Sequence, residues 1–296
     1  MQIKEYLKEK GQEVEDALRR FMLPAVGELA PHIEAMRYSL LAGGKRVRPI
    51  LCLATAEALG RDPAPGLAVA CALECIHTYS LIHDDLPAMD DDELRRGHPT
   101  NHVVFGEAAA ILAGDGLLTF AFELLSQAEL GEWLPGCDQL RIIRLVAQAA
   151  GPLGMVGGQA MDIASENKEI PFATLRSIHS RKTGALITAA VQCGAIIGQA
   201  SEPQFAALTT YGEQLGLAFQ IVDDLLNIEG TAAELGKAVG SDAERHKATY
   251  PAFFGVEETR TKAAQAVAGA EAALALLGRP AEPLRALAQY ILTRTR

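Results

Sequence analysis

Apolar residues recur along the chain at the spacing of an α-helix. In residues 205–228, Leu215, Phe219, Val222 and Leu226 follow one another at steps of four, three and four, which places them on one helical face. The same period predicts further helices over residues 33–41, 67–85, 108–125 and 263–277.

Strand signals are sparse, so the pattern predicts an all-α fold. No stretch alternates apolar and polar residues over a useful length, and no Asn-Gly or Asp-Gly hairpin turn joins two such stretches. Gly43 and Gly44 end the first predicted helix, and Pro49 suits the first turn of the next. Because no linker or fixed-period repeat divides the chain, we expect one domain over residues 1–296, with roughly ten or more helices.

Composition agrees with a helical, folded chain. Of the 296 residues, 49% are hydrophobic, which is enough for a core and excludes a disordered protein. Only 5% are aromatic, which favours helices over strands. Lys and Arg number 27 and Asp and Glu number 37, so the net charge of −10 argues against broad nucleic-acid binding.

The termini and cysteines indicate a reducing cytoplasm. Residues 1–10 alternate in charge where a secretory signal would be apolar. The apolar stretch 184–198 is short and rich in Ala and Gly, so we expect a buried helix there and no transmembrane segment. The five cysteines include Cys71 and Cys75, which could face one metal. No matching Cys or His pair accompanies them, so core packing is the better interpretation.

Two acidic clusters follow apolar helical runs. The first has six acids within residues 84–93, starting with Asp84 and Asp85. Negative charge at a helix C-terminus opposes the helix dipole, and a bound cation would offset it. In the second, Gln220, Asp223 and Asn227 share one helical face. Either cluster alone could be a solvated surface, but together they predict facing helices that bind a hard cation such as Mg²⁺.

Basic residues are grouped beside these acids, which predicts a phosphorylated ligand. Mg²⁺ usually takes one or two carboxylates and completes its shell with water and phosphate oxygens. The sequence lacks the spacing of a P-loop or a dinucleotide fingerprint. The clustered cations are Lys45, Arg46, Arg48, Arg95, Arg96, Arg181, Lys182, Lys237 and Lys247.

With these motifs the chain resembles the short-chain trans-isoprenyl diphosphate synthases, with the closest match to the bacterial enzymes that make farnesyl diphosphate. The matching motifs occur in family order. They are Gly-Gly-Lys-Arg-Val-Arg-Pro at 43–49, Asp-Asp-Leu-Pro-Ala-Met-Asp at 84–90, Gly-Gly-Gln at 157–159, Lys-Thr-Gly at 182–184, Phe-Gln-Ile-Val-Asp-Asp at 219–224, Lys237, and Lys-Ala-Thr-Tyr-Pro at 247–251. The resemblance implies a large single-domain helical bundle around a deep central cavity, usually assembled as a homodimer.

The resemblance also implies a role for each motif residue. Asp84, Asp90 and Asp223 would bind Mg²⁺, with three ions in each active site and Mn²⁺ as a substitute. The implied catalytic residues are Asp84, Asp85, Asp90, Lys182, Asp223 and Lys237. Those implied to hold isopentenyl diphosphate are Lys45, Arg48, His77 and Arg96. Those implied to hold the allylic diphosphate are Arg95, Lys182, Thr183, Gln220 and Lys237. Gly44 and Lys247 complete the implied substrate-binding set. The family normally has a third acid where this chain has Asn227, which puts a metal-binding role for that position in doubt.

The reaction implied by the resemblance is head-to-tail condensation of isopentenyl diphosphate with dimethylallyl or geranyl diphosphate. A bulky residue five positions before the first acidic motif limits chain growth in the family, so Tyr79, beside Ser80, suggests the C15 product farnesyl diphosphate. C20 and C10 products remain alternatives. A class I terpene cyclase, a non-catalytic prenyl diphosphate-binding subunit and a plain helical scaffold are rivals. The basic residues Lys45, Arg48 and Arg96 argue against the cyclase, and the retained acids argue against the subunit.

Overall fold

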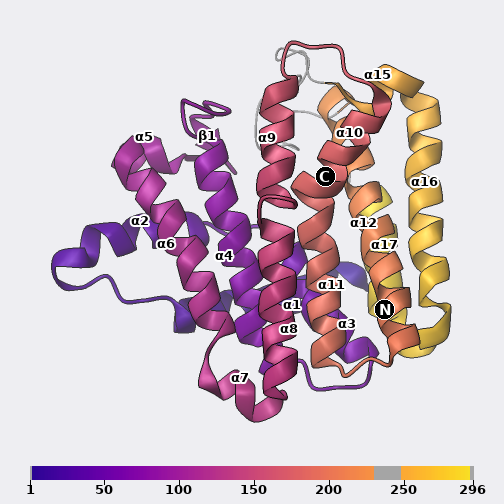
Figure 1. Ribbon diagram of the computed structural model, residues 1–296, viewed down its shortest axis with the longest axis horizontal. Coiled ribbons are helices and arrows are strands. Elements are labelled where there is room, and N and C mark those ends of the chain that lie inside the picture. Colours follow the sequence, from indigo (N-terminus) through magenta and orange to yellow (C-terminus); the bar gives the residue numbers. More distant parts are fainter. Residues whose placement is uncertain (1, 230–247, 294–296) are drawn as a thin grey trace.

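A computed structural model describes residues 2–229 and 248–293, and this part of the chain is almost entirely helical (Figure 1). The first half contains α1 (Ile3–Phe21), α2 (Ala30–Leu40), α3 (Val47–Ala58), α4 (Leu67–Asp84), α5 (Asn101–Phe105), α6 (Glu107–Leu125) and α7 (Ala128–Trp133). The second half contains α8 (Gly136–Ala150), α9 (Met155–Ser165), α10 (Phe172–His179), α11 (Ala185–Ile197), α12 (Glu202–Glu229), α15 (Tyr250–Phe254), α16 (Val256–Ala273) and α17 (Glu282–Thr293).

The helices expected from periodicity are confirmed. Residues 108–125 fall in α6 and 205–228 in α12, while 33–41 and 67–85 each extend one residue past the ends of α2 and α4. Residues 263–277 extend from α16 into a 3₁₀ turn, Leu274–Leu277. The stretch 184–198 forms the buried helix α11. Periodicity succeeds here because each helix buries an apolar surface against its neighbours.

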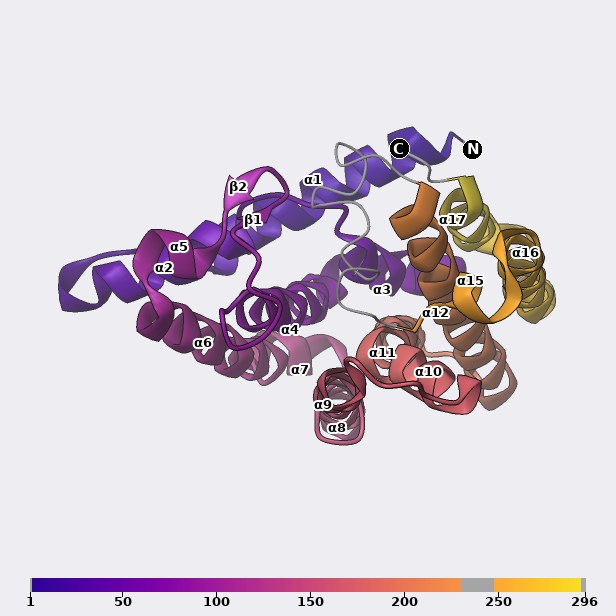
Figure 2. The same ribbon diagram turned by 90° about the horizontal axis from the view of Figure 1, so that it is seen from above.

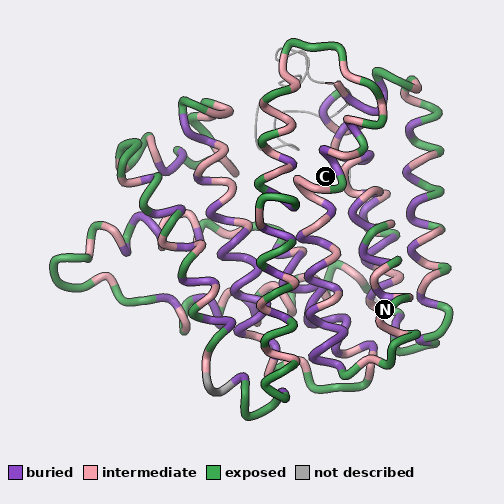
Figure 3. The backbone as a smooth tube through the Cα atoms, in the orientation of Figure 1, coloured by how far each residue is buried: buried purple, intermediate pink, exposed green. Residues whose placement is uncertain are grey.

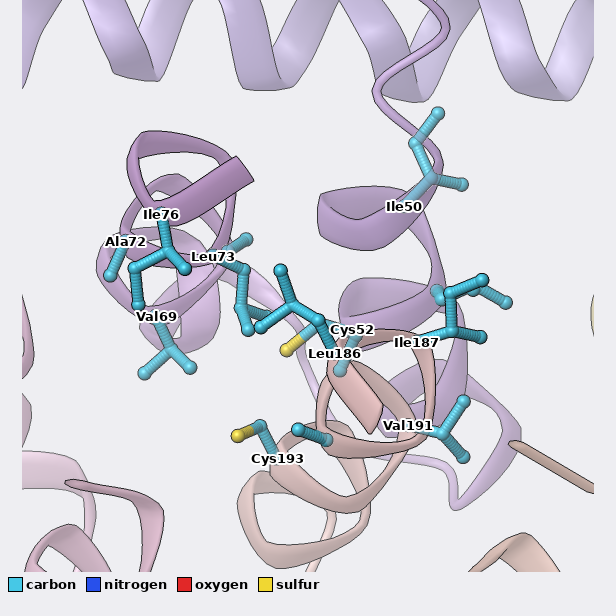
Figure 4. Packing of buried hydrophobic residues seen from close by; sticks show 14 of the residues in the cluster. Ile50, Cys52, Val69, Ala72, Leu73, Ile76, Leu186, Ile187, Val191 and Cys193 are labelled. Carbon is cyan, nitrogen blue, oxygen red and sulfur yellow. The ribbon is translucent and has the colours of Figure 1, made fainter. Parts of the chain in front are cut away.

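Helix α4 lies inside the bundle. It packs against α6, α3 and α11, while α11 also packs on α12 and α8. Figure 3 shows the buried residues concentrated on these central helices, and Figure 2 shows α16 at the opposite end of the bundle from α2. Side chains from three helices meet in the core, including Cys52 of α3, Leu73 of α4 and Leu186 of α11 (Figure 4). Because neighbouring helices pack around α4, the carboxylates at its C-terminal end, Asp84 and Asp85, are attached to a well-packed helix.

A short hairpin departs from the purely helical prediction. Strands β1 (Leu94–Arg95) and β2 (His98–Pro99) pair in an antiparallel manner. Arg96 and Gly97 form the turn between them, with φ values of 55° and 79°. Two positive φ values are typical of a type I′ turn, whose twist matches that of the strands. The Arg-Gly pair is a weak sequence signal for this turn, so the hairpin was missed.

The cysteines have no disulfide bonds. Cys52, Cys71, Cys75 and Cys193 are buried, which confirms core packing for Cys71 and Cys75. Burial raises the pKa of these four thiols, so they stay protonated. Cys137 is exposed.

Two segments have the length and composition to cross a membrane, Ala64–Asp84 and Glu107–Trp133. The apolar window of the first is 72% buried within the protein and that of the second is 44% buried. A core helix passes the same test, and the position of α4 inside the bundle favours that interpretation. The absence of a transmembrane segment stays a prediction.

Candidate active site

The first acidic cluster begins at the C-terminus of α4. Asp84 is the last helical residue, and the backbone N–H of Asp90 donates to its carbonyl at 2.8 Å, so the chain turns back and brings these two acids together. Burial, with the nearby charges of Asp90 and Asp85, raises the pKa of Asp84 to about 6, although Lys182 opposes the rise. A carboxylate that is both partly buried and crowded by acids is stabilised by a cation, so this pair fits Mg²⁺.

Asp85 faces a different partner. It is only 3% exposed, and its two carboxylate oxygens accept from Nε of Arg95 at 2.7 and 2.9 Å. Nη2 of Arg95 donates to the same carboxylate. Burial raises the pKa of Asp85, whereas Arg95 opposes the rise. The structure therefore gives Asp85 a different partner from Asp84 and Asp90, namely the predicted substrate-binding residue Arg95.

Two of the predicted isopentenyl diphosphate residues, Arg48 and Arg96, lie near a third, His77. Gly44 lies so close to Arg96 that a Cβ there would be 2.6 Å from the guanidinium carbon, and Arg96 donates to the carbonyl of Gly43. Burial, followed by the charges of Arg48 and Arg96, lowers the pKa of His77 well below its usual value. His77 is therefore neutral at pH 7, and the positive charge of this group comes from the arginines.

Beside this group, a cavity of about 310 Å³ is bounded by α1, α12, α17 and the turn before α3. Gly44 and Lys45 line it on one side, and Phe219 and Leu287 line it on the other. Lys45 is exposed, whereas Arg48 is 9% exposed. Val47 of α3 lines the same cavity as Phe219 of α12, so α12 and the start of α3 face each other across it.

Lys182 and Thr183, which are predicted to hold the allylic diphosphate, lie in a π-helical turn, Ser180–Gly184, between α10 and α11. Such turns interrupt a helix and frequently occur at functional sites. Nζ of Lys182 donates to Asp162 Oδ2 at 2.8 Å. Burial by itself would lower the pKa of Lys182, but Asp162 and then Asp84 raise it, so the ammonium group stays charged.

Asp162 was missed by the sequence reasoning. It lies three positions after Gln159 on α9, and an acid at that helical spacing from the Gly-Gly-Gln motif was the available signal. Gly158 explains why α9 can approach so closely, because a Cβ there would lie 2.2 Å from the backbone nitrogen of Lys182. Both side-chain polar atoms of Gln159 are buried without a hydrogen-bond partner among the described residues.

The second acidic cluster lies in the last turns of α12. Gln220 and Asp223 share a face as predicted, with Nε2 of Gln220 donating to Asp223 Oδ2 at 3.5 Å. Asp224 faces the other way and accepts from the backbone N–H of Tyr250 at 2.8 Å. Asn227 is 6% exposed. The predicted residues Lys237 and Lys247 lie outside the described residues.

The predicted chain-length residues lie on α4, one turn before its acidic end. Tyr79 is 5% exposed, and its ring meets His83 edge to face, with the ring centroids 5.7 Å apart. Ser80 donates its hydroxyl to the carbonyl of His77 at 2.8 Å. Tyr79 is thus packed tightly enough to limit the growth of a product chain. The Ser80 hydroxyl is hydrogen-bonded within its own helix.

Within residues 2–229 and 248–293, no group of three or more His, Cys, Asp or Glu side chains is close enough to hold a metal by itself. This result fits an ion that takes one or two carboxylates from the protein and its remaining ligands from water and a diphosphate. Asp84, Asp90 and Asp223 have the chemistry for that arrangement.

Comparison with known proteins agrees with this geometry. The polyprenyl synthetase family model matches residues 31–274. The farnesyl diphosphate synthase of Geobacillus stearothermophilus is 53% identical over 264 residues, covering 89% of this chain and 88% of the relative. The farnesyl diphosphate synthase of Escherichia coli (strain K12) is 47% identical over 289 residues, covering 96% of each. A geranylgeranyl diphosphate synthase of Cyanophora paradoxa is 46% identical over 290 residues, covering 98% and 95%.

The fold is also similar to solved structures. The crystal structure of an FPP/GFPP synthase from Zymomonas mobilis superposes with a TM-score of 0.87, at 38% identity and with 98% of each chain covered. The family match and the relatives each span most of the sequence. The chain belongs to the polyprenyl synthetase family.

Proposed function

We propose that this chain is a prenyltransferase that condenses isopentenyl diphosphate with dimethylallyl or geranyl diphosphate to give farnesyl diphosphate. The observation that carries the proposal is the presence of two sets of cations near the first acidic cluster and His77. The charges of Arg48 and Arg96 act on His77, and those of Lys182 and Arg95 act on Asp84. Two groups of this kind suit two diphosphates, whereas a terpene cyclase needs to bind one.

In this reaction, the residues act mainly through charge and position. Lys182, with Arg95, would stabilise the charge that develops on the leaving allylic diphosphate. Lys45, Arg48 and Arg96 would fix isopentenyl diphosphate so that its double bond faces the allylic carbon. The buried side of α4, including Tyr79, would keep water from the allylic cation.

Polyprenyl synthetases generally use Mg²⁺. We propose that each site binds three of these ions, with Mn²⁺ as a substitute. Their protein ligands would be Asp84 and Asp90 and, from α12, Asp223. When bound, Mg²⁺ supplies positive charge that makes diphosphate a better leaving group. Lys237 and Lys247 stay in the proposed site as predictions from the sequence.

We also propose a single catalytic domain and a homodimer in the cytoplasm. Exposed apolar side chains on α6, Ile111 and Leu112, support an interface between copies. Five free cysteines support a reducing compartment.

The test is incubation of the protein with dimethylallyl and isopentenyl diphosphates, followed by chromatography of the dephosphorylated products. We expect Mg²⁺-dependent formation of a C15 alcohol, with C10 as an intermediate and no growth after chelation of the metal. A hydrocarbon formed from farnesyl diphosphate alone would support a cyclase instead. The absence of any chain growth with Mg²⁺ would contradict the proposal.

Geranylgeranyl diphosphate is the second candidate product, because a geranylgeranyl diphosphate synthase is nearly as similar to this chain as the farnesyl diphosphate synthases. Tyr79 favours C15 since its bulky, buried ring lies five positions before Asp84, where a large side chain limits chain growth in the family. A dominant C20 product in the same assay would select the second candidate.

A further inference from the structure

Arg46 lies between Lys45 and Arg48 in the sequence, but its side chain is buried in the protein. It is 2% exposed. Its Nη1 donates to Glu74 Oε1 at 2.6 Å, and its Nε donates to Glu15 Oε1 at 2.7 Å. These two carboxylates come from α4 and α1. Arg46 is therefore engaged with the helices behind the turn, unlike the exposed Lys45.

Arg46 also determines the course of the backbone between α2 and α3. Its Nη2 donates to the carbonyl of Leu40, the last residue of α2, at 2.7 Å. Its own backbone is left-handed, with φ 45° and ψ 35°, and its carbonyl accepts from the N–H of Ile50 as α3 begins. A non-glycine residue keeps this conformation only where its surroundings hold it. The three side-chain donors thus fix the turn that presents Lys45 and Arg48.

The ion pair between Arg46 and Glu74 also affects Arg48. Its side chain is 1% exposed, and its charge acts on Arg48 and Arg96 as well as on Arg46. Nε of Arg48 is buried and has no hydrogen-bond partner in the described part of the chain. Without Arg46, Glu74 would be a buried carboxylate in need of a cation, and Arg48 is a nearby guanidinium that could supply it.

We propose that Arg46 is a positioning residue for the isopentenyl diphosphate site. It fixes the 43–48 turn and keeps the Glu74 carboxylate paired, so that Arg48 stays available to the diphosphate. The inference rests on the proposed function, which assigns Lys45 and Arg48 to that ligand. Arg46 itself does not bind the ligand, because all three of its nitrogens donate within the protein.

The test measures KM separately for the two substrates in Arg46→Met. We expect KM for isopentenyl diphosphate to rise about tenfold or more, because Glu74 then competes for Arg48. KM for dimethylallyl diphosphate should change less than about twofold, since Lys182 and Arg95 bond Asp162 and Asp85 and not the acceptors that hold Arg46. Adding Glu74→Gln to this variant should recover most of the lost affinity, because the competing charge is removed.

Two further variants keep the test decisive. If thermal unfolding shows that Arg46→Met does not fold, Arg46→Lys takes its place. Lys keeps the charge but cannot reach three acceptors at once, so KM for isopentenyl diphosphate should still rise selectively, by a smaller factor. Tyr6→Phe is the matched control, because it removes the α1-to-α3 hydrogen bond from Tyr6 to Glu57 at a distance from the turn. It should lower stability without changing either KM.

Equal increases in both KM values, no increase at all, or a double variant as impaired as Arg46→Met would each overturn the inference. If the unaltered protein shows no chain growth, the proposed function fails and not this inference alone. If the unaltered protein is active and Arg46→Met keeps its KM for isopentenyl diphosphate, only the positioning role fails.

Discussion

The Asp84–Asp85 pair of α4 and the Asp223–Asp224 pair of α12 look alike in sequence but differ in what their second members hold. In both pairs the first aspartate is partly exposed and the second is buried. Asp85 binds the guanidinium of Arg95, whereas Asp224 accepts a hydrogen bond from the backbone N–H of Tyr250. Adjacent residues on a helix point about 100° apart, so one of each pair can face the ligand while the other braces the surrounding structure.

The contrast shows that the two acidic motifs support the site in different ways. Asp85 orients a cation that is proposed to bind the allylic diphosphate. Asp224 attaches the end of α12 to the start of α15, and the ring of His179 stacks on Tyr250 at the same point. Burial lowers the pKa of His179 to about 4, so the imidazole beside Asp224 is neutral at pH 7. In the first motif, Asp85 therefore fixes the side chain of Arg95. In the second, Asp224 fixes the backbone at Tyr250.

The largest effect is expected from replacing the first aspartate of either pair. Asp84→Asn and Asp223→Asn each remove a charge from the proposed metal site, and kcat should fall by about 10²–10³-fold. Steady-state assays of chain growth at saturating Mg²⁺ measure this. Circular dichroism should show that both variants are folded, and a loss of less than about fivefold in either would contradict a metal-binding role.

A smaller and selective effect is expected from Asp85→Asn. The amide keeps the size of the side chain but cannot hold Arg95 as a bidentate ion pair. KM for the allylic diphosphate should rise by about tenfold, which is near the cost of a lost charge-assisted hydrogen bond. KM for isopentenyl diphosphate serves as the internal control and should stay within about twofold. Equal changes in the two values would show that Asp85 does not act through Arg95.

Asp224→Ala should affect stability more than the reaction. It leaves the buried N–H of Tyr250 without its acceptor, which should lower the free energy of unfolding by about 1–3 kcal/mol. Urea unfolding measures this loss. Because Asp224 does not face the proposed metal, kcat in the folded fraction should fall by no more than about tenfold. A loss of activity as large as that of Asp223→Asn would make the two aspartates equivalent and break the comparison.

The smallest effect on rate is expected from Tyr79→Ala, which tests a further difference between the helices. Five positions before its aspartates, α4 has Tyr79, whereas α12 has Ala218. Removing the ring should extend the main product beyond C15 with kcat changed less than about twofold, since Tyr79 holds neither diphosphate. Chromatography of the products measures this. Ser80→Ala is the control and should leave the product unchanged, because the Ser80 hydroxyl bonds its own helix. An unchanged product in Tyr79→Ala would show that another residue limits chain length.

The sequence predicted the helices and both acidic clusters, because helical periodicity and charge are local properties. It did not reveal that Asp85 pairs with Arg95, since Arg95 lies in a hairpin ten positions away. It also grouped Arg46 with the other cations of its motif, whereas Glu74 and Glu15, 28 and 31 positions distant, draw this side chain into the core. Asp162 was missed for the same reason, because only the folded chain brings α9 beside Lys182. Partners that are distant in sequence decide each of these roles.

Activation by Mg²⁺ tests most directly the claim that, in the α4 pair, Asp84 faces the metal while Asp85 holds Arg95. The measurement is the Mg²⁺ concentration that gives half-maximal chain growth in the unaltered protein, Asp84→Asn and Asp85→Asn. We predict that Asp85→Asn keeps the value of the unaltered protein within about twofold at saturating allylic diphosphate, while Asp84→Asn needs at least about tenfold more Mg²⁺. Equal increases in both variants would contradict the division.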